Sequence, residues 1–339
     1  MNRNYSIDLL KCLSCFAVVC LHVAGMIVTQ YFEQYTISHF IYYLASFAIP
    51  IFFMVNGYLL LSKKEMSYQY AFLKILKMIK VVLLWNIFFA FLFLIIKNSI
   101  YNPLIMSVDN LLQRGILFQF WFFGALSIIY IILPILYKIF NKNDKIAILL
   151  SMFFIILCTG IDIVNFIRIS EGSNLIQENV IQTFRLWTWL AYFTLGGMFS
   201  KKNITDKIYN KVPMSSNGII LLILCFICPI YEYFVSNYFY HTIAAEYFYD
   251  SILMFLWTSS MFIFINRLNI KYGKLLKIIS DNMIGIFILH ILIKKMVFKI
   301  NINTPVLNSL SILIVFIISL FISDIIRKIP LIKNWIKMY

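Results

Sequence analysis

The sequence predicts an all-α, polytopic integral membrane protein with about ten transmembrane helices and both termini in the cytosol. Hydrophobic residues make up 62% of the 339 residues, and only 13% are charged. A soluble protein of this length has no single core large enough to bury so much apolar surface. Apolar runs of about 18 or more residues recur along the chain, and each is long enough to cross a bilayer as a helix.

Hydropathy places the membrane helices in ten stretches. The first is too long for the apolar region of a signal peptide and has no obvious cleavage site, so we expect it to stay in the membrane. The longest outer loop, 97–118, has an amphipathic end suited to the membrane surface.

The chain 1–339 is expected to form one membrane domain, with a core at about 7–326 and a cytosolic basic tail at 327–339. In order, the predicted spans are 7–29, 39–61, 80–96, 119–138, 146–167, 183–200, 216–235, 247–266, 279–298 and 305–326.

The net charge of +15 is distributed unevenly along the chain. If the N-terminus lies in the cytosol, most lysines and arginines fall in cytosolic segments and few fall in outer ones. The positive-inside rule therefore favours cytosolic termini. Because the charge mainly reflects topology, nucleic acid is not an expected partner, whereas the lipid bilayer is.

The first span carries ionisable residues that are costly in a membrane helix. Lys11 and His22 stand eleven residues apart, which at about 100° per residue is about 20° past three full turns. They share a face and lie about 16.5 Å apart along the helix axis. Asp8 and Ser14 extend the same polar stripe. Asp8 and Lys11 are three residues apart and are expected to pair, which lowers the cost of burying either charge.

Two interpretations of this stripe remain open. In one, the polar side chains only hydrogen-bond the helix into the bundle. In the other, which we favour, they line an internal cavity that reaches from the cytosolic side. The imidazole of His22 then serves as a general base, and Lys11 attracts an anionic group that enters from the cytosol.

Other polar groups have simpler interpretations. Lys74, Lys77 and Lys80, called the lysine cluster below, share one broad helical face, and we favour topology and lipid phosphate contact over a phosphorylated cytosolic cofactor. His290, in the ninth span, is expected to pack between helices. The six cysteines include two CxxC pairs. Both pairs lie in apolar helices without a loop to wrap a metal ion, so no metal site is expected.

Five segments, in chain order, resemble one known family. The first span fits the Lys/Arg-x10-His pattern of the acyltransferase family 3 membrane proteins, with Lys11 as the last residue of "SIDLLK" and His22 eleven residues later. Two departures are Asn56, where serine is usual, and Phe287, where tyrosine is common. The other segments are "AIPIFFMVNGYLLL" (48–61), similar to PxFFxxSGYLL, "FWFFGALSIIYIILPIL" (120–136), similar to WFLxxLxxxYLxxPxL, "LAYFTLGGMFSKK" (190–202), similar to YFxxGxxxxK, and "SDNMIGIFILHILI" (280–293), similar to SxxxxxIYLLH.

The resemblance implies an integral-membrane O-acyltransferase of surface glycans. Such proteins move an acyl group, usually acetyl, from cytosolic acetyl-CoA or another acyl-CoA to a hydroxyl of a cell-surface or lipid-linked polysaccharide. By this resemblance His22 is the catalytic histidine, which deprotonates the acceptor hydroxyl or carries the acyl group transiently. Lys11 would orient the donor or hold the helix through Asp8. The lysine cluster would meet the CoA phosphates.

The main alternative is a transporter or flippase for a polysaccharide precursor, because ten helices suit either task. A transporter would not strictly need His22, would bind no acyl-CoA, and would more often show internal repeats, which we do not find in the sequence. A third interpretation is a membrane domain that only binds or senses. No soluble enzyme domain is attached, so we expect the chain to act alone or with unlinked partners of cell-envelope biosynthesis. Its richness in Ile, Lys and Asn hints at a bacterial source and a place in the bacterial cytoplasmic membrane.

Overall fold

The computed structural model describes residues 3–30, 34–298, 304–330 and 332–336. These residues form helices and connecting segments without a strand, which confirms the all-α prediction. Within them, eight apolar helical stretches are long enough to cross a membrane. The eight are α1 (Tyr5–Gln30), the stretch Ile37–Leu61, α4 (Tyr68–Lys97), α6 (Trp121–Phe140), α7 (Asp144–Ser170), α11 (Met214–Val235), α13 (Lys274–Val297) and α14 (Pro305–Lys328).

Two of the ten predicted spans, 183–200 and 247–266, correspond to shorter helices. Helix α9 (Leu186–Phe199) has 14 residues, and α12 (Ile252–Arg267) has 16. Most residues of α9 are buried inside the protein. A helix that other helices enclose does not have to match the thickness of the hydrocarbon layer, so its length is not fixed by the bilayer.

The predicted span 39–61 is broken into two helices, α2 (Ile37–Leu44) and α3 (Ala48–Leu61). Pro50 lies in the first turn of α3, where its missing N–H leaves no intrahelical hydrogen bond unmade. Ser46 lies in the break, and its hydroxyl donates to Glu232 Oε1 of α11 at 2.9 Å. The break between α2 and α3 therefore carries a polar contact with α11.

Helices α3 and α9 touch along their backbones at two glycines. A Cβ atom on Gly57 would overlap the carbonyl oxygen of Phe193, and one on Gly196 would overlap the carbonyl oxygen of Met54. Small residues are the usual means by which membrane helices approach closely, because packing rather than the hydrophobic effect holds such helices together. These two glycines therefore set the spacing between α3 and α9.

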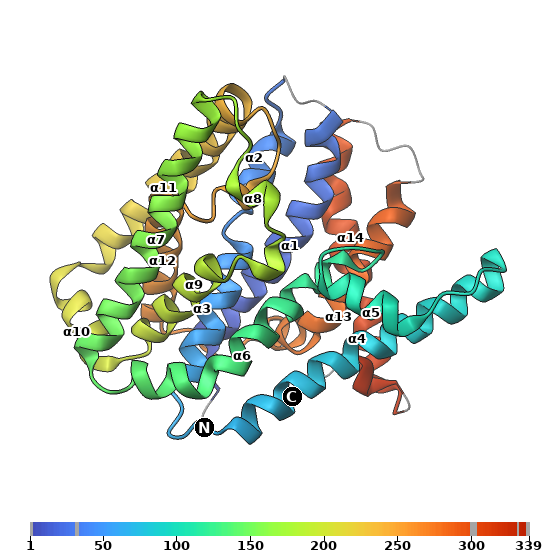
Figure 1. The fold of residues 1–339 in the computed structure, drawn as a ribbon, viewed down its shortest axis with the longest axis horizontal. Coiled ribbons are helices and arrows are strands. Elements are labelled where there is room, and N and C mark those ends of the chain that lie inside the picture. Colours follow the sequence, from blue (N-terminus) through green and yellow to red (C-terminus); the bar gives the residue numbers. More distant parts are fainter. Residues whose placement is uncertain (1–2, 31–33, 299–303, 331, 337–339) are drawn as a thin grey trace.

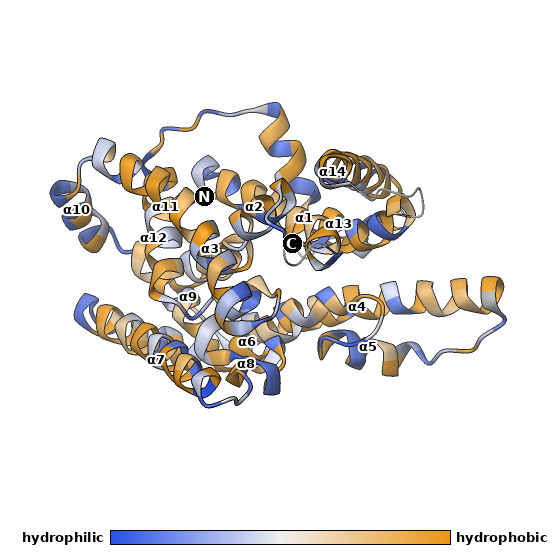
Figure 2. Ribbon diagram, turned by 90° about the horizontal axis from the view of Figure 1, so that it is seen from above, coloured by the Kyte–Doolittle hydropathy of each residue, from blue (hydrophilic) through white to orange (hydrophobic). Residues whose placement is uncertain are grey.

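Helix α4 begins at Tyr68, well before the predicted boundary at residue 80, and Ser67 Oγ caps it by accepting from the Tyr70 amide. Hydropathy placed the boundary too late because the lysines lower the local average, although lysine is a good helix former. Figure 1 shows α4 running along the bottom of the bundle, and its end projects beyond the bundle beside α5 (Pro103–Leu111). The projecting part is largely apolar (Figure 2), as a helix exposed to lipid requires.

The start of α1 and the end of α14 lie on the same side of the bundle. Arg3 Nη1, just before α1, is 3.2 Å from Asp281 Oδ1, and Arg327 Nη2, near the end of α14, is 3.5 Å from Asp281 Oδ2. Two chain ends that meet one carboxylate must leave the bundle on the same face. This agrees with the prediction that both termini lie on one side of the membrane.

The predicted basic tail, 327–339, is partly packed against the bundle. Its short helix η6 (Lys333–Ile336) lies beside α4, where the Trp85 Nε1–H donates to the carbonyl oxygen of Trp335 at 3.0 Å. Residues 331 and 337–339 of this tail lie outside the described residues. The described part of the tail is therefore anchored by at least one hydrogen bond.

Candidate active site

The site begins with the predicted pair of Asp8 and Lys11 at the start of α1. Lys11 Nζ is 3.6 Å from Asp8 Oδ1, which confirms the pairing. The buried carboxylate of Asp8 also accepts hydrogen bonds from Arg3 Nε and, at 3.0 Å, from the hydroxyl of Ser280 in α13. The hydrogen bond with Asp8 is the largest effect raising the pKa of Arg3. Three donors thus hold one carboxylate, so Lys11 is not its sole counter-charge.

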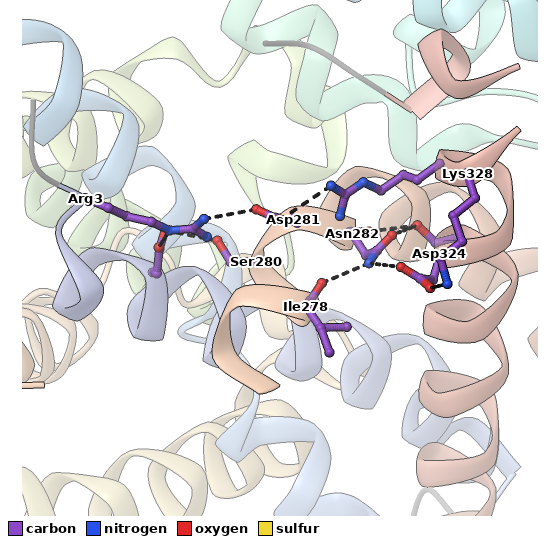
Figure 3. A network of polar contacts seen from close by, with 10 residues as sticks. Arg3, Ile278, Ser280, Asp281, Asn282, Asp324 and Lys328 are labelled. Carbon is purple, nitrogen blue, oxygen red and sulfur yellow. Dashed lines mark hydrogen bonds and ion pairs between the residues drawn. The ribbon is translucent and has the colours of Figure 1, made fainter. Parts of the chain in front are cut away.

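Around Asp8, polar contacts continue across the ends of α13 and α14 (Figure 3). Asn282 Oδ1 accepts from the hydroxyl of Ser323 at 2.8 Å, and Asn282 Nδ2 donates to Asp324 Oδ1 at 3.4 Å. Lys328 pairs with Asp324 at 2.6 Å. Together with the contacts of Asp281, these bonds tie α1, α13 and α14 at one end. The Asp8 end of the stripe is therefore a structural support of the helix that carries His22.

A cavity with a volume of about 100 Å³ opens between α1, α3, α4, α6 and α13. Lys11 and Lys74 both line it, from α1 and α4. Its other polar lining residues are Asn56 and Tyr130, and Tyr130 Oη donates to Asn56 Oδ1 at 3.1 Å. The rest of the lining is apolar and aromatic. Two ammonium groups in an otherwise apolar space favour an anionic ligand with a long apolar part.

Of the lysine cluster, only Lys74 lines this cavity. Lys77 and Lys80 are exposed and are not among its lining residues. Residues three apart on a helix drift by about 60° per step, and that drift is enough to turn the second and third lysines away. The structure thus brings Lys11 and Lys74 together, although they are far apart in the sequence, and separates Lys74 from its two neighbours.

His22 does not line the cavity, contrary to the prediction that Lys11 and His22 share one polar space. Phe287 of α13 does line it, and its ring lies 6.2 Å from that of His290, measured between centroids. The His290 ring in turn lies 5.1 Å from the ring of His22. Because of the helical periodicity of α1, the side chains of Lys11 and His22 point in the same direction. The neighbouring helix α13 occupies the space between these two side chains. His22 is therefore separated from the cavity wall by the ring of His290.

The surroundings of His22 are formed by residues that the sequence did not assign to the site. Phe118 packs against its ring with centroids 5.5 Å apart, and Lys294 Nζ donates to its carbonyl oxygen at 3.2 Å. His290 is fully buried. The sequence contains a pattern that links two of these residues. His290 and Lys294 are four residues apart and so share one face of a helix. Within the described residues no group of three or more His, Cys, Asp or Glu side chains is arranged to hold a metal ion.

With this fold and site in view, the chain proves to match a protein family described as an acyltransferase domain, over residues 4–328. That match covers nearly the whole chain, so the protein belongs to this family, acyltransferase family 3. It is a multi-pass membrane acyltransferase. No curated protein and no solved structure is detectably similar to the chain.

Proposed function

We propose that this protein transfers a short acyl group, in the simplest case acetyl, from acyl-CoA to a hydroxyl of a cell-surface or lipid-linked polysaccharide in the bacterial cytoplasmic membrane. The observation that carries the proposal is the cavity with Lys11 and Lys74 at its polar positions and the two histidines beyond its aromatic wall. The family supplies the reaction class, and the cavity supplies a place for the donor.

The cavity suits acyl-CoA because its two kinds of lining match the two parts of that molecule. The phosphates of CoA are anionic, and ammonium groups bind phosphate through charge-assisted hydrogen bonds. The pantetheine arm and the acyl chain carry less charge and fit among aromatic side chains. In this arrangement Lys74 and Lys11 hold the charged part, and the thioester points toward Phe287. Since Phe287 and then His290 stand between the cavity and His22, both rings have to turn aside for the thioester to reach His22.

The reaction moves one proton from the acceptor hydroxyl to the departing sulfur. The hydroxyl oxygen forms a bond to the thioester carbonyl carbon, the carbon–sulfur bond breaks, and CoA leaves as a thiol. We assign His22 to the handling of this proton, because imidazole both accepts and donates a proton near neutral pH. Lys294, which already reaches the backbone of His22, provides positive charge near the place where the carbonyl oxygen becomes negative.

The proposed function is tested by measuring ester-linked acyl groups on surface glycans, by NMR before and after mild base, in cells with and without this protein. Ester that appears only with the protein supports the proposal and identifies the acyl group. Equal acylation in both kinds of cell contradicts it. If the glycan itself is missing from the surface without the protein, a transporter for the glycan precursor becomes the better explanation.

Replacing Lys74 with methionine is expected to weaken the binding of acetyl-CoA by about 10- to 100-fold. A hydrogen bond to a charged group contributes about 1.5–3 kcal/mol, and each 1.4 kcal/mol corresponds to about tenfold in affinity. Binding is measured on purified protein in detergent by equilibrium dialysis with labelled acetyl-CoA. Lys77→Met and Lys80→Met are matched controls from the same helix, and both should bind within about twofold of wild type. If all three variants lose affinity equally, diffuse charge rather than the cavity attracts the donor.

A further inference from the structure

His290 is a buried imidazole with one nitrogen already used. Its Nδ1 lies 3.0 Å from the carbonyl oxygen of Ile286, one turn earlier in α13. A carbonyl oxygen only accepts, so Nδ1 must carry the hydrogen, and in the neutral ring Nε2 then presents a lone pair. The ring is fully buried, and among the described residues Nε2 has no hydrogen-bond partner.

A second acceptor in the same neighbourhood also lacks a partner. Gln119 is 1% exposed, and its Nε2 is 3.4 Å from the carbonyl oxygen of Ile288, two residues before His290. Its Oε1 has no partner among the described residues. Gln119 follows Phe118, whose ring packs on His22. Buried acceptors without donors are costly, and a ligand that brings hydrogen-bond donors would satisfy both of these.

We propose that His290 Nε2 binds the acceptor hydroxyl and takes its proton, so that His290 and His22 work as a pair. A hydroxyl group is the donor that a fixed, uncharged acceptor nitrogen selects, and the other hydroxyls of a sugar suit Gln119 Oε1. This inference rests on the proposed function, since that function supplies the hydroxyl. In this arrangement the proton taken by His290 passes on to His22, whose ring lies beside it.

The hydroxyl proton moves to His290 Nε2 while the hydroxyl oxygen attacks the thioester carbonyl carbon. The carbon–sulfur bond breaks. The proton passes from His290 to one ring nitrogen of His22, whose ring is 5.1 Å away between centroids, and the other ring nitrogen of His22 gives its proton to the departing sulfur. Both histidines end the cycle uncharged, and the products are the ester and free CoA.

The test compares His290→Gln and His290→Ala with wild type in detergent-permeabilised membranes given ¹⁴C-labelled acetyl-CoA. Base-labile label in the glycan fraction should fall by about 100-fold or more in both variants, the size expected for loss of a general base. Acetyl-CoA binding to the purified variants should stay within about twofold, because His290 lies outside the donor cavity. Added imidazole, which fits the space left by His290→Ala, should restore part of the transfer.

A matched control is His39, which is also buried, with 1% exposure and an Nε2 atom without a partner among the described residues. It caps the start of α2 through Thr36 instead of contacting His22. His39→Gln should transfer acetyl at nearly the wild-type rate, and imidazole should not change the rate of His39→Ala. The inference is overturned if His290→Gln transfers within about threefold of wild type, or if imidazole fails to rescue His290→Ala. Absence of label in wild type would contradict the proposed function instead.

Discussion

Replacing His22 with alanine is expected to lower the ester content of the surface glycan by about 100- to 10,000-fold, the range that a proton-transferring side chain contributes to a reaction. The change removes one imidazole of the His22–His290 pair and leaves the Asp8 network at the other end of α1 intact. The measurement is NMR of base-released acyl groups, normalised to the amount of protein found in the membrane.

Two comparisons make this result decisive. His22→Gln keeps a polar side chain of similar size, and it should be as inactive as His22→Ala because an amide does not exchange protons near neutral pH. His39→Ala removes another buried histidine of the same bundle and should keep normal acylation. Full ester content in His22→Ala cells with normal protein level would show that His22 takes no part in the chemistry.

The second large effect is expected at the glycines between α3 and α9. Gly57→Ala and Gly196→Ala each place a methyl group on a carbonyl oxygen of the facing helix, and backbone cannot move aside as a side chain can. Overpacking of this kind costs about 1–3 kcal/mol, and more where the backbone is rigid. We expect both variants to melt at lower temperature than wild type, as measured by size-exclusion chromatography of heated samples in detergent.

Gly160→Ala is the matched control for this experiment. Gly160 lies in α7, and a Cβ atom there would meet nothing within 4 Å. Alanine in a helix interior is more favourable than glycine by about 0.5–1 kcal/mol, so this variant should melt at the same temperature as wild type or higher. Equal losses in all three variants would mean that the effect comes from glycine itself and not from the contact of α3 with α9.

The positions of most helices, and contacts between residues of one helix, could be predicted from the sequence. Hydropathy located the spans, and the spacing of three residues correctly paired Asp8 with Lys11. Even the boundary error at α4 has a local cause, since the window average treats lysines as loop residues although they continue the helix from Tyr68. Such features depend on residues a few positions apart, and the sequence presents those directly.

The parts that could not be predicted depend on which helices are neighbours. Lys74 was grouped with Lys77 and Lys80 by spacing, but the cavity joins it to Lys11. From the sequence, His290 is expected only to pack between helices. Its contact with His22 arises because α13 lies beside α1, and no local pattern states that two helices nearly 270 residues apart are adjacent.

The partners of α1 also bear on how the protein is made. Ser280, which donates to Asp8, follows it by 272 residues, and Lys294 follows His22 by the same number. At about 5–20 residues per second, the ribosome needs roughly 14–54 s to synthesise that length. During this interval the polar side chains of a newly inserted α1 have only nearby residues to bond, and Asp8 has Arg3 and Lys11. Until Ser280 is made, Arg3 and Lys11 are therefore the donors that stabilise Asp8 in the membrane.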